Sequence, residues 1–113
     1  MARTGGTDPR LPLTPAVFQV LVALADDEQH GYALLKSVER QTGGRTRLST
    51  GTLYGIIDRL LADGLIAERT AGGRRLYRLT PPGRRAALAE ADRLEALLAQ
   101  ARATRALRRP SRA

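Results

Sequence analysis

The residues of this chain best suited to chemistry are small polar residues and a tyrosine that lie close together: Ser49, Thr50, Gly51, Thr52 and Tyr54. Ser49 has the residue type of a helix N-cap, so hydroxyls and backbone N–H groups meet at a helix start, which suits a phosphate. The Tyr54 hydroxyl can reach a phosphate, and its ring can reach a thymine methyl. The cluster indicates a nucleic-acid partner. The alternative is that Ser49 only caps the helix and Tyr54 only packs at the edge of the core.

A second candidate group consists of arginines around a glycine pair. Arg69, Arg74, Arg75 and Arg78 flank Gly72-Gly73. A turn with guanidinium groups on both sides suits contacts with DNA phosphates or with the minor groove. A solvated charged loop is the alternative interpretation. Two further cations, Lys36 and Arg59, lie on predicted helices, where each can reach a phosphate or equally lie in solvent.

Catalysis and metal binding find no support in the sequence. Cysteine is absent, which excludes disulfides, thiol catalysis and cysteine-based zinc sites. His30 is the only histidine, and one imidazole cannot hold zinc without further nitrogen or sulfur ligands. We expect His30 to be a structural residue at a helix start. A phosphate-binding glycine loop with a lysine is also missing. The sequence therefore predicts no enzyme, no metal and no cofactor.

The composition of the chain also favours a nucleic-acid partner. The chain of 113 residues carries a formal charge of +8, and its pI is about 11.3. Such a chain attracts polyanions, because neutralised phosphates release counterions. The arginine bias itself has a simpler explanation in a GC-rich genome. No signal-peptide pattern is present, and no segment approaches the ~18 apolar residues of a membrane span, so we expect a cytoplasmic protein without membrane contact.

The apolar spacing predicts three helices before the arginine turn. Residues 1–12 lack periodicity and read as a flexible arm. Thr14 and Pro15 start a first helix over about 15–26, with apolar positions Val17, Phe18, Leu21, Leu24 and Ala25. A second helix begins near His30-Gly31 and stops at Gly43-Gly44, with apolar positions Tyr32, Leu34, Leu35 and Val38.

The third helix carries the strongest periodic signal in the chain. It begins at Ser49 and ends at Gly64, and its apolar set matches the helical template in full: Leu53, Ile56, Ile57, Leu60 and Leu61. With that stripe in the core, the outward face holds Thr52, Tyr54, Gly55, Asp58, Arg59 and Ala62. Gly51 and Gly55 then share one face and leave a bare strip where DNA can approach closely.

Two short strands and a long helix complete the chain. Residues 65–69 and 75–79 read as strands joined by a turn over 70–73, where Gly72-Gly73 permits a tight connection. Thr80 and Pro81 then start a helix over 81–108. The fold class is mainly α with a small β-hairpin: a winged helix-turn-helix over 13–80 plus a long C-terminal dimerisation helix over 81–108, with a basic tail over 109–113. In such a fold the third helix enters the major groove and the hairpin lies along the phosphates.

Self-association follows from a seam on the last helix. Ala87, Ala91, Leu94, Leu98 and Ala101 repeat at alternating steps of four and three, as in a heptad pattern. A helix of about 40 Å is too long to be covered by one small domain. We expect a homodimer whose interface contains Phe18, Leu88, Ala91, Leu94, Leu97, Leu98 and Ala101.

A series of short motifs resembles the PadR-type transcriptional regulators over about residues 13–88. The motifs occur in this order: 26–31 followed by Tyr32, then 42–44, 48–54, 63–66, 72–75 and 77–80. The resemblance implies a bacterial winged-helix repressor that dimerises through its terminal helices and is sometimes relieved by a small molecule. It also points to Tyr54 as a DNA contact.

The chain departs from the family pattern at two positions and in length. Relatives usually place proline where this chain has Thr50 and Gly55. Gly55 should loosen the third helix by about 1 kcal/mol relative to alanine. A single C-terminal helix replaces the larger domain of many relatives, which puts an elaborate effector pocket in doubt; a groove between the first and last helices, at the dimer interface, is where an effector would bind.

The sequence thus predicts a dimeric regulator of double-stranded DNA that binds an inverted repeat with half-sites spaced by roughly 10 base pairs or a multiple. Its DNA contacts are expected at Lys36, Ser49, Thr50, Gly51, Thr52, Tyr54, Arg59, Gly72, Gly73, Arg74 and Arg75. Two alternatives stay open. One is a winged helix that docks proteins, and the other is a nonspecific nucleic-acid binder.

Overall fold

The structure, a computed structural model, describes residues 11–108 and residue 110. The elements follow the order α1 (Pro15–Ala23), β1 (Gln29–His30), α2 (Gly31–Gln41), α3 (Thr50–Ala62), β2 (Ile66–Ala71), β3 (Arg74–Leu79) and α4 (Pro81–Ala103), with a final 3₁₀ turn η2 (Arg105–Leu107). Most of the predicted N-terminal arm and of the basic tail lies outside the described residues.

Each of the four helices starts at a capping side chain, and three of these caps are the predicted ones. The hydroxyls of Thr14, Ser49 and Thr80 accept hydrogen bonds from the backbone N–H groups of Val17, Thr52 and Gly83 at 3.1–3.2 Å. His30 Nδ1 accepts from the Ala33 N–H at 3.4 Å and caps α2. Each cap satisfies one N–H that the first helical turn would otherwise leave without a partner. The expectation that His30 is structural at a helix start is confirmed.

The sheet is antiparallel and has the strand order β1-β3-β2. Gly72 and Gly73 have φ values of 58° and 77°, so they form a two-residue turn of the kind that needs left-handed residues. The predicted four-residue turn over 70–73 is therefore wrong, because Thr70 and Ala71 pair with Arg75 and Arg74. The strand β1 was not predicted; Gln29 and His30 pair with Tyr77 and Leu76 on the other edge of β3.

The core lies where α1, α2 and α3 meet beneath the sheet. Its buried apolar side chains come from the three helices, from the sheet and from the segment between α3 and β2, and they include Val20, Leu21, Leu34, Val38, Leu53, Ile57, Leu60, Leu65 and Tyr77. Two of the apolar residues whose spacing predicts the first two helices lie outside the core. Tyr32 is 65% exposed, because Leu34 and Val38 form the inward stripe of α2, and Ala25 is exposed beyond the end of α1. The first helix stops at Ala23 rather than near residue 26, and residues 24–26 form a turn.

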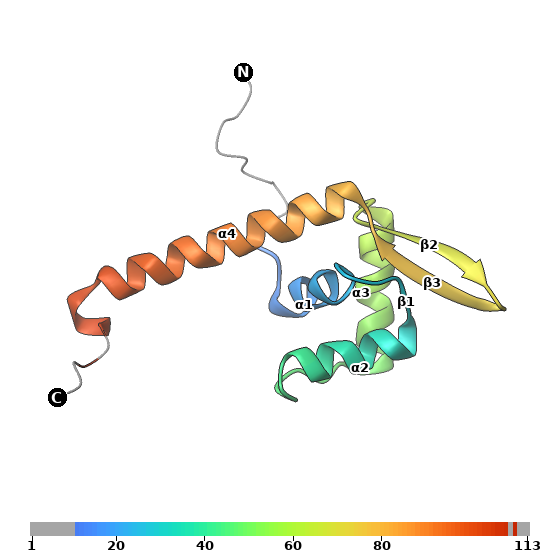
Figure 1. The fold of residues 1–113 in the computed structure, drawn as a ribbon, viewed down its shortest axis with the longest axis horizontal. Helices are drawn as coiled ribbons and strands as arrows, with labels where there is room; N and C mark the ends of the chain where they lie inside the picture. Colours follow the sequence, from blue (N-terminus) through green and yellow to red (C-terminus); the bar gives the residue numbers. More distant parts are fainter. Residues whose placement is uncertain (1–10, 109, 111–113) are drawn as a thin grey trace, which may run out of the picture.

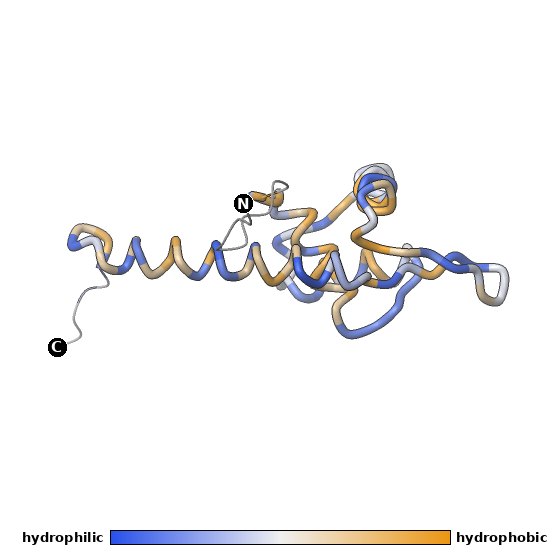
Figure 2. Tube along the Cα trace, turned by 90° about the horizontal axis from the view of Figure 1, so that it is seen from above, coloured by the Kyte–Doolittle hydropathy of each residue, from blue (hydrophilic) through white to orange (hydrophobic). Residues whose placement is uncertain are grey.

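The helix α4 leaves the body of the protein on the side opposite the β2–β3 hairpin (Figure 1). Its first turns pack on α1, where Ala86 is buried, whereas its far half projects alone (Figure 2). The helix ends at Ala103, so the expected end at residue 108 is wrong. Thr104 leaves the helical conformation with φ −76° and ψ 123°, and η2 follows.

A buried carboxylate fastens α4 to the start of the domain. Glu90 is 2% exposed, and it accepts two hydrogen bonds from Arg93, at 2.9 Å and 2.6 Å, and a third from the Leu13 N–H at 3.3 Å. The Arg93 hydrogen bonds lower the pKa of Glu90 although burial acts in the opposite direction. The ionised carboxylate thus holds the chain ahead of α1 against α4.

Among the described residues, no helix combines the length and the apolar character that crossing a bilayer requires.

Candidate nucleic-acid interface

The outward face of α3 is as the apolar stripe predicts. Gly51, Thr52, Tyr54, Gly55, Asp58, Arg59 and Ala62 are all exposed, and Leu53, Ile57 and Leu60 are buried. At the tip of the helix the Ser49 hydroxyl donates to Thr52 Oγ1 at 2.9 Å and accepts from the Thr52 N–H. Added Cβ atoms at Gly51 and Gly55 would meet nothing. The N-terminal half of α3 is therefore a low, polar ridge that another molecule can approach.

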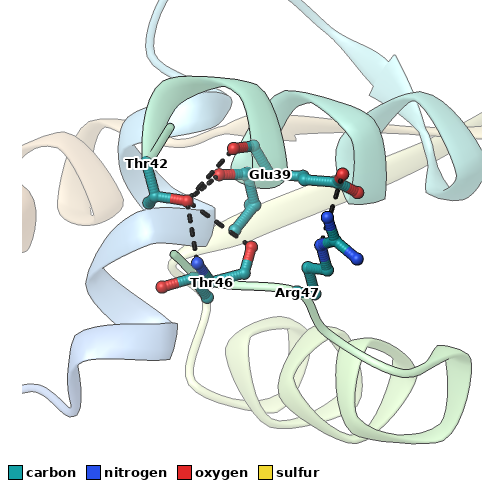
Figure 3. Close-up of polar contacts among 5 residues, drawn as sticks. Glu39, Thr42, Thr46 and Arg47 are labelled. Carbon is teal, nitrogen blue, oxygen red and sulfur yellow. Dashed lines mark hydrogen bonds and ion pairs between the residues drawn. The ribbon is translucent and has the colours of Figure 1, made fainter. Parts of the chain in front are cut away.

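The loop between α2 and α3 fixes the position of this ridge. Gly43 and Gly44 have φ values of 62° and 81° and end α2 as predicted. Thr42 Oγ1 then accepts from the Thr46 N–H at 3.0 Å and can donate to the Val38 carbonyl at 2.9 Å (Figure 3). Arg47 pairs with Glu39 at 3.5 Å across the same loop (Figure 3). These contacts hold the turn of the helix-turn-helix against the helix that precedes it.

A pocket of about 470 Å³ lies where the start of α2, the middle of α3 and β3 meet. Its lining includes His30, Gly31, Tyr54, Arg74 and Tyr77. Tyr54 reaches the start of α2 because Gly31 has no side chain; any Cβ there would overlap the Tyr54 hydroxyl. Burial raises the pKa of Tyr77, which forms the buried part of the lining. The position of Tyr54 fits both interpretations of this residue. Its ring packs at the edge of the core, and it is still 40% exposed, so it can also contact DNA.

The β2–β3 hairpin, residues 66–79, is the wing of this fold, and its arginines differ in how firmly they are held. Arg69 makes two hydrogen bonds with Glu28, at 2.7 Å and 2.6 Å, which lower the pKa of Glu28 and raise that of Arg69. Arg75 lies 3.8 Å from Glu68, and Arg74 Nη1 lies 3.0 Å from His30 Nε2. Arg69 therefore ties the wing to the segment before β1, whereas Arg74 and Arg75 are turned toward the pocket.

Two further predicted contacts lie outside the pocket. Lys36 Nζ lies 5.6 Å from the centre of the Tyr32 ring on the exposed side of α2, so the pair presents a cation and an aromatic ring to solvent. Arg59 is exposed on the outward face of α3, and no ion pair joins it to Asp58 or Asp63. The structure thus gathers Tyr54, Arg74 and Arg75 at one pocket and spreads the other predicted contacts around it.

The residues expected at a dimer interface lie away from this surface. Leu88, Leu94, Leu97 and Leu98 of α4 are between 41% and 56% exposed, Ala91 is exposed, and Phe18 and Ala101 are half-buried. A second pocket, of about 370 Å³, lies between residues 24–28, which follow α1, the end of β3 and the start of α4. Its lining is largely charged, with Asp26, Asp27, Glu28, Arg78 and Arg84 among the residues.

One residue of the site was missed by the sequence interpretation. His30 lines the pocket beside Arg74, but it was predicted only as a structural residue. Its neighbour Gly31 and its place at a helix start were visible in the sequence. The pairing of β1 with β3, which brings His30 next to the wing, was not.

Comparison with known proteins agrees with this arrangement. The family described as "Transcriptional regulator PadR-like family" matches residues 20–89. Transcriptional regulator Rv3488 of Mycobacterium tuberculosis is 42% identical over 82 residues, which make up 69% of this chain and 74% of that protein. An uncharacterized 37.1 kDa protein in transposon TN4556 of Streptomyces fradiae is 46% identical over 66 residues, so the match covers 58% of this chain and 19% of that longer protein.

The solved structures show the same fold. Bacillus subtilis PadR in complex with operator DNA matches with a TM-score of 0.60 and 23% identity, over 74% of this chain and 48% of that one. The predicted architecture, a winged helix-turn-helix followed by a long C-terminal helix, is confirmed.

Proposed function

This chain belongs to the PadR-like family of transcriptional regulators, and we propose that it binds a specific operator in double-stranded DNA as a homodimer and represses transcription there. It is a regulator and not an enzyme. Residues 13–80 form the DNA-binding domain in this proposal, and α4 joins the two subunits. The proposal places the protein in the cytoplasm, where a bacterial regulator meets its DNA.

The observation that best supports DNA binding is that a low polar ridge and a basic pocket lie next to each other. The N-terminal half of α3 exposes Ser49, Thr50, Gly51 and Thr52, and Arg74 and Arg75 of the wing lie beside it. Hydroxyls and a helix N-terminus position a phosphate, while the glycine strip lets α3 approach base edges in the major groove. The remaining proposed contacts are Lys36, Tyr54, Arg59, Gly72 and Gly73.

The dimer is supported by the uncovered face of α4. Leu94 and Leu98 lie one helical turn apart and are both exposed, on a half of the helix that no other element of the described chain covers (Figure 1). Exposed leucines at heptad spacing are typical of a helix–helix interface. Two copies related by a twofold axis would present their α3 ridges to an inverted repeat, with half-sites about 10 base pairs apart or a multiple of that.

A small-molecule effector at the dimer interface stays part of the proposal in a limited form. A pocket between residues 24–28, which follow α1, and the start of α4 is lined by carboxylates and arginines, which suits a polar ligand better than a flat apolar one. None of the residues proposed for the dimer interface lines it. A thermal-shift screen of charged and apolar ligands would test this; no stabilisation by any ligand at about millimolar concentration would contradict it.

The central experiment is fluorescence anisotropy with DNA from immediately upstream of the chain's own gene and with a scrambled duplex, across a salt series. We expect binding at least about a hundredfold tighter to the native duplex. Tyr54→Ala and the double variant Arg74→Ala/Arg75→Ala should weaken it. The double variant Arg84→Ala/Arg85→Ala, which removes the same two charges from the exposed surface of α4, is the matched control and should not.

The other outcomes of this experiment would each indicate a different function. Equal and strongly salt-dependent binding to both duplexes would indicate a nonspecific nucleic-acid binder. Absence of binding even at low salt would overturn DNA recognition and favour a winged helix that docks proteins.

A further inference from the structure

The contacts of His30 cannot all be satisfied by one imidazole ring. Nδ1 faces the Ala33 N–H at 3.4 Å, and Nε2 faces Arg74 Nη1 at 3.0 Å. Both neighbours are hydrogen-bond donors, because a backbone amide and a guanidinium have no lone pair to accept with. A neutral imidazole has only one acceptor nitrogen; the other carries a proton.

Either tautomer therefore leaves two donors facing each other. If Nδ1 accepts from Ala33 and caps α2, Nε2 carries the proton and points at the guanidinium of Arg74. If Nε2 accepts from Arg74, the protonated Nδ1 points at the Ala33 N–H and the cap of α2 is lost. A capping side chain stabilises the start of its helix, which favours the first arrangement. Two N–H groups, from His30 and Arg74, then point at the same space with no acceptor between them.

That space is the pocket between α2, α3 and the wing, and donors dominate it. Besides His30 and Arg74, its lining includes Arg75, the Tyr54 ring and the first residue of α2, Gly31. No carboxylate belongs to the lining; Glu68 approaches only Arg75, at 3.8 Å. The side chain of Tyr77 is buried beneath these groups. An anion with several lone pairs is the ligand that such a set of donors lacks.

We propose that this pocket binds one backbone phosphate of the DNA, held between the Nε2–H of His30 and the guanidinium of Arg74, so that His30 contacts DNA as well as capping α2. This inference rests on the proposed function, because the phosphate is one of the operator's. One phosphate oxygen can accept hydrogen bonds from both N–H groups, so that neither donor is left without an acceptor. It also fixes the wing against the start of α2 when DNA is bound.

The first test uses inorganic phosphate as the probe. His30 is the only histidine in the chain, so its imidazole resonances in an NMR spectrum need no assignment among competitors. Titration with sodium phosphate should shift the Nε2 resonance saturably and hold the proton on Nε2, while sodium chloride at equal ionic strength should not. Arg74→Gln should abolish the shift. A response identical in the two salts would overturn the proposal, whether or not the protein binds DNA.

The second test uses His30→Asn in the full chain. Asparagine is among the best N-cap residues, so α2 keeps its cap, whereas the Nε2–H donor is lost. We expect affinity for operator and scrambled duplex to fall by the same factor, about tenfold, while the slope of log K against log salt stays nearly unchanged, because a neutral imidazole donor releases no counterion and Arg74 still neutralises the phosphate. Far-ultraviolet circular dichroism and the melting temperature check that the fold is unchanged.

Replacing one backbone phosphate by an uncharged methylphosphonate shows directly which phosphate His30 contacts. Duplexes with a single methylphosphonate at successive positions should include one position per half-site that weakens His30→Asn less than it weakens the wild type, because only the Arg74 contact to that phosphate remains in the variant. Unchanged binding by His30→Asn to an operator that the wild type recognises would overturn this inference and leave the proposed function standing. Failure of the wild type to distinguish operator from scrambled DNA would refute the proposed function, and the phosphate titration would still decide whether the pocket binds phosphate.

Discussion

The hydroxyl of Tyr54 occupies the place where a side chain on Gly31 would begin. Helix α3 and the first turn of α2 therefore meet without a Cβ between them, and the ring of Tyr54 forms one wall of the pocket beside the wing. The glycine is thus needed for close approach and not for an unusual backbone conformation, because its φ is not positive. The ring that lines the proposed DNA surface also determines how α2 and α3 pack.

Gly31→Ala should lower the free energy of unfolding by about 1–3 kcal/mol, since the new methyl group must displace Tyr54 or the backbone of α2. Tyr54→Phe removes the overlapping oxygen and should relieve part of that loss. Urea unfolding of the two single variants and of the double variant gives their coupling energy, which we expect to exceed about 0.5 kcal/mol. Strict additivity of the two changes would contradict the contact.

Gly55→Ala should change stability and DNA affinity in opposite directions. The position is helical and exposed, and an added Cβ would meet nothing, so alanine should stabilise the fold by about 1 kcal/mol. The same methyl group would stand between α3 and the major groove, and should weaken operator binding by about 1 kcal/mol, roughly fivefold. Thermal unfolding and anisotropy on the same sample check both. A stabilised variant with unaltered affinity would place Gly55 outside the DNA contact.

The elements that repeat apolar residues, or that combine a cap with a proline, were predictable from the sequence. Ser49 and the stripe from Leu53 to Leu61 predict α3 nearly to the residue, because both the cap and the stripe depend on local spacing. The same holds for the starts of α1 and α4 at Thr14 and Thr80. The predictions of helix ends were less accurate, since nothing in the sequence marks Ala23 or Ala103 as the last helical residue.

The features that the sequence did not predict depend on residues far apart in the chain. Strand β1 has only two residues, Gln29 and His30, which form a strand only because the edge of β3 offers them partners. The burial of Glu90 in the middle of α4 depends on hydrogen bonds from Arg93 and from the N–H of Leu13, which lies 77 residues earlier in the chain. Tyr32 is part of the apolar spacing that predicts α2, but its side chain is exposed because the helix turns Leu34 inward instead.

The carboxylate of Glu90 should make stability depend on pH. Its pKa is lowered in the folded protein from its ordinary value of 4.5, so the unfolded chain takes up a proton first as the pH falls. The stabilisation is therefore complete above about pH 4.5 and is lost as the pH falls through the folded pKa. At pH 7, Glu90→Gln should lower the free energy of unfolding by about 1–3 kcal/mol.

Urea unfolding at about pH 7 and pH 3.5 tests this. The difference between wild type and Glu90→Gln should shrink at the lower pH. Glu28, whose pKa is also lowered, is present in both proteins and cancels in the comparison. Glu95→Gln, which changes an exposed carboxylate on the same helix, is the control and should give a small difference at both values. An unaltered wild-type advantage at low pH would argue against an ionised Glu90.

Leu94→Glu should dissociate the dimer and leave the subunit folded. The side chain is 41% exposed, so the subunit loses little packing, whereas a charge in the seam of two α4 helices would be buried without a partner. We expect the free energy of dimerisation to weaken by about 2 kcal/mol, which raises the dimer dissociation constant ~30-fold. Sedimentation equilibrium measures this constant. Ala96→Glu adds the same charge on the opposite side of the heptad pattern and should have no effect. Equal dissociation by both variants, or a monomeric wild type, would refute the interface.

Two arginines of one hairpin should differ in their contribution to DNA binding. Arg74 points at the pocket and lies beside His30, whereas both hydrogen bonds of Arg69 go to Glu28. Arg74→Gln should therefore weaken binding to operator and scrambled duplex alike, and lower the slope of log K against log salt by about 1. Arg69→Gln removes the same charge nearby and should leave that slope nearly unchanged, because its guanidinium is already neutralised by a carboxylate. Equal changes of slope in the two variants would mean that only the net charge of the wing matters and that the pocket makes no specific phosphate contact.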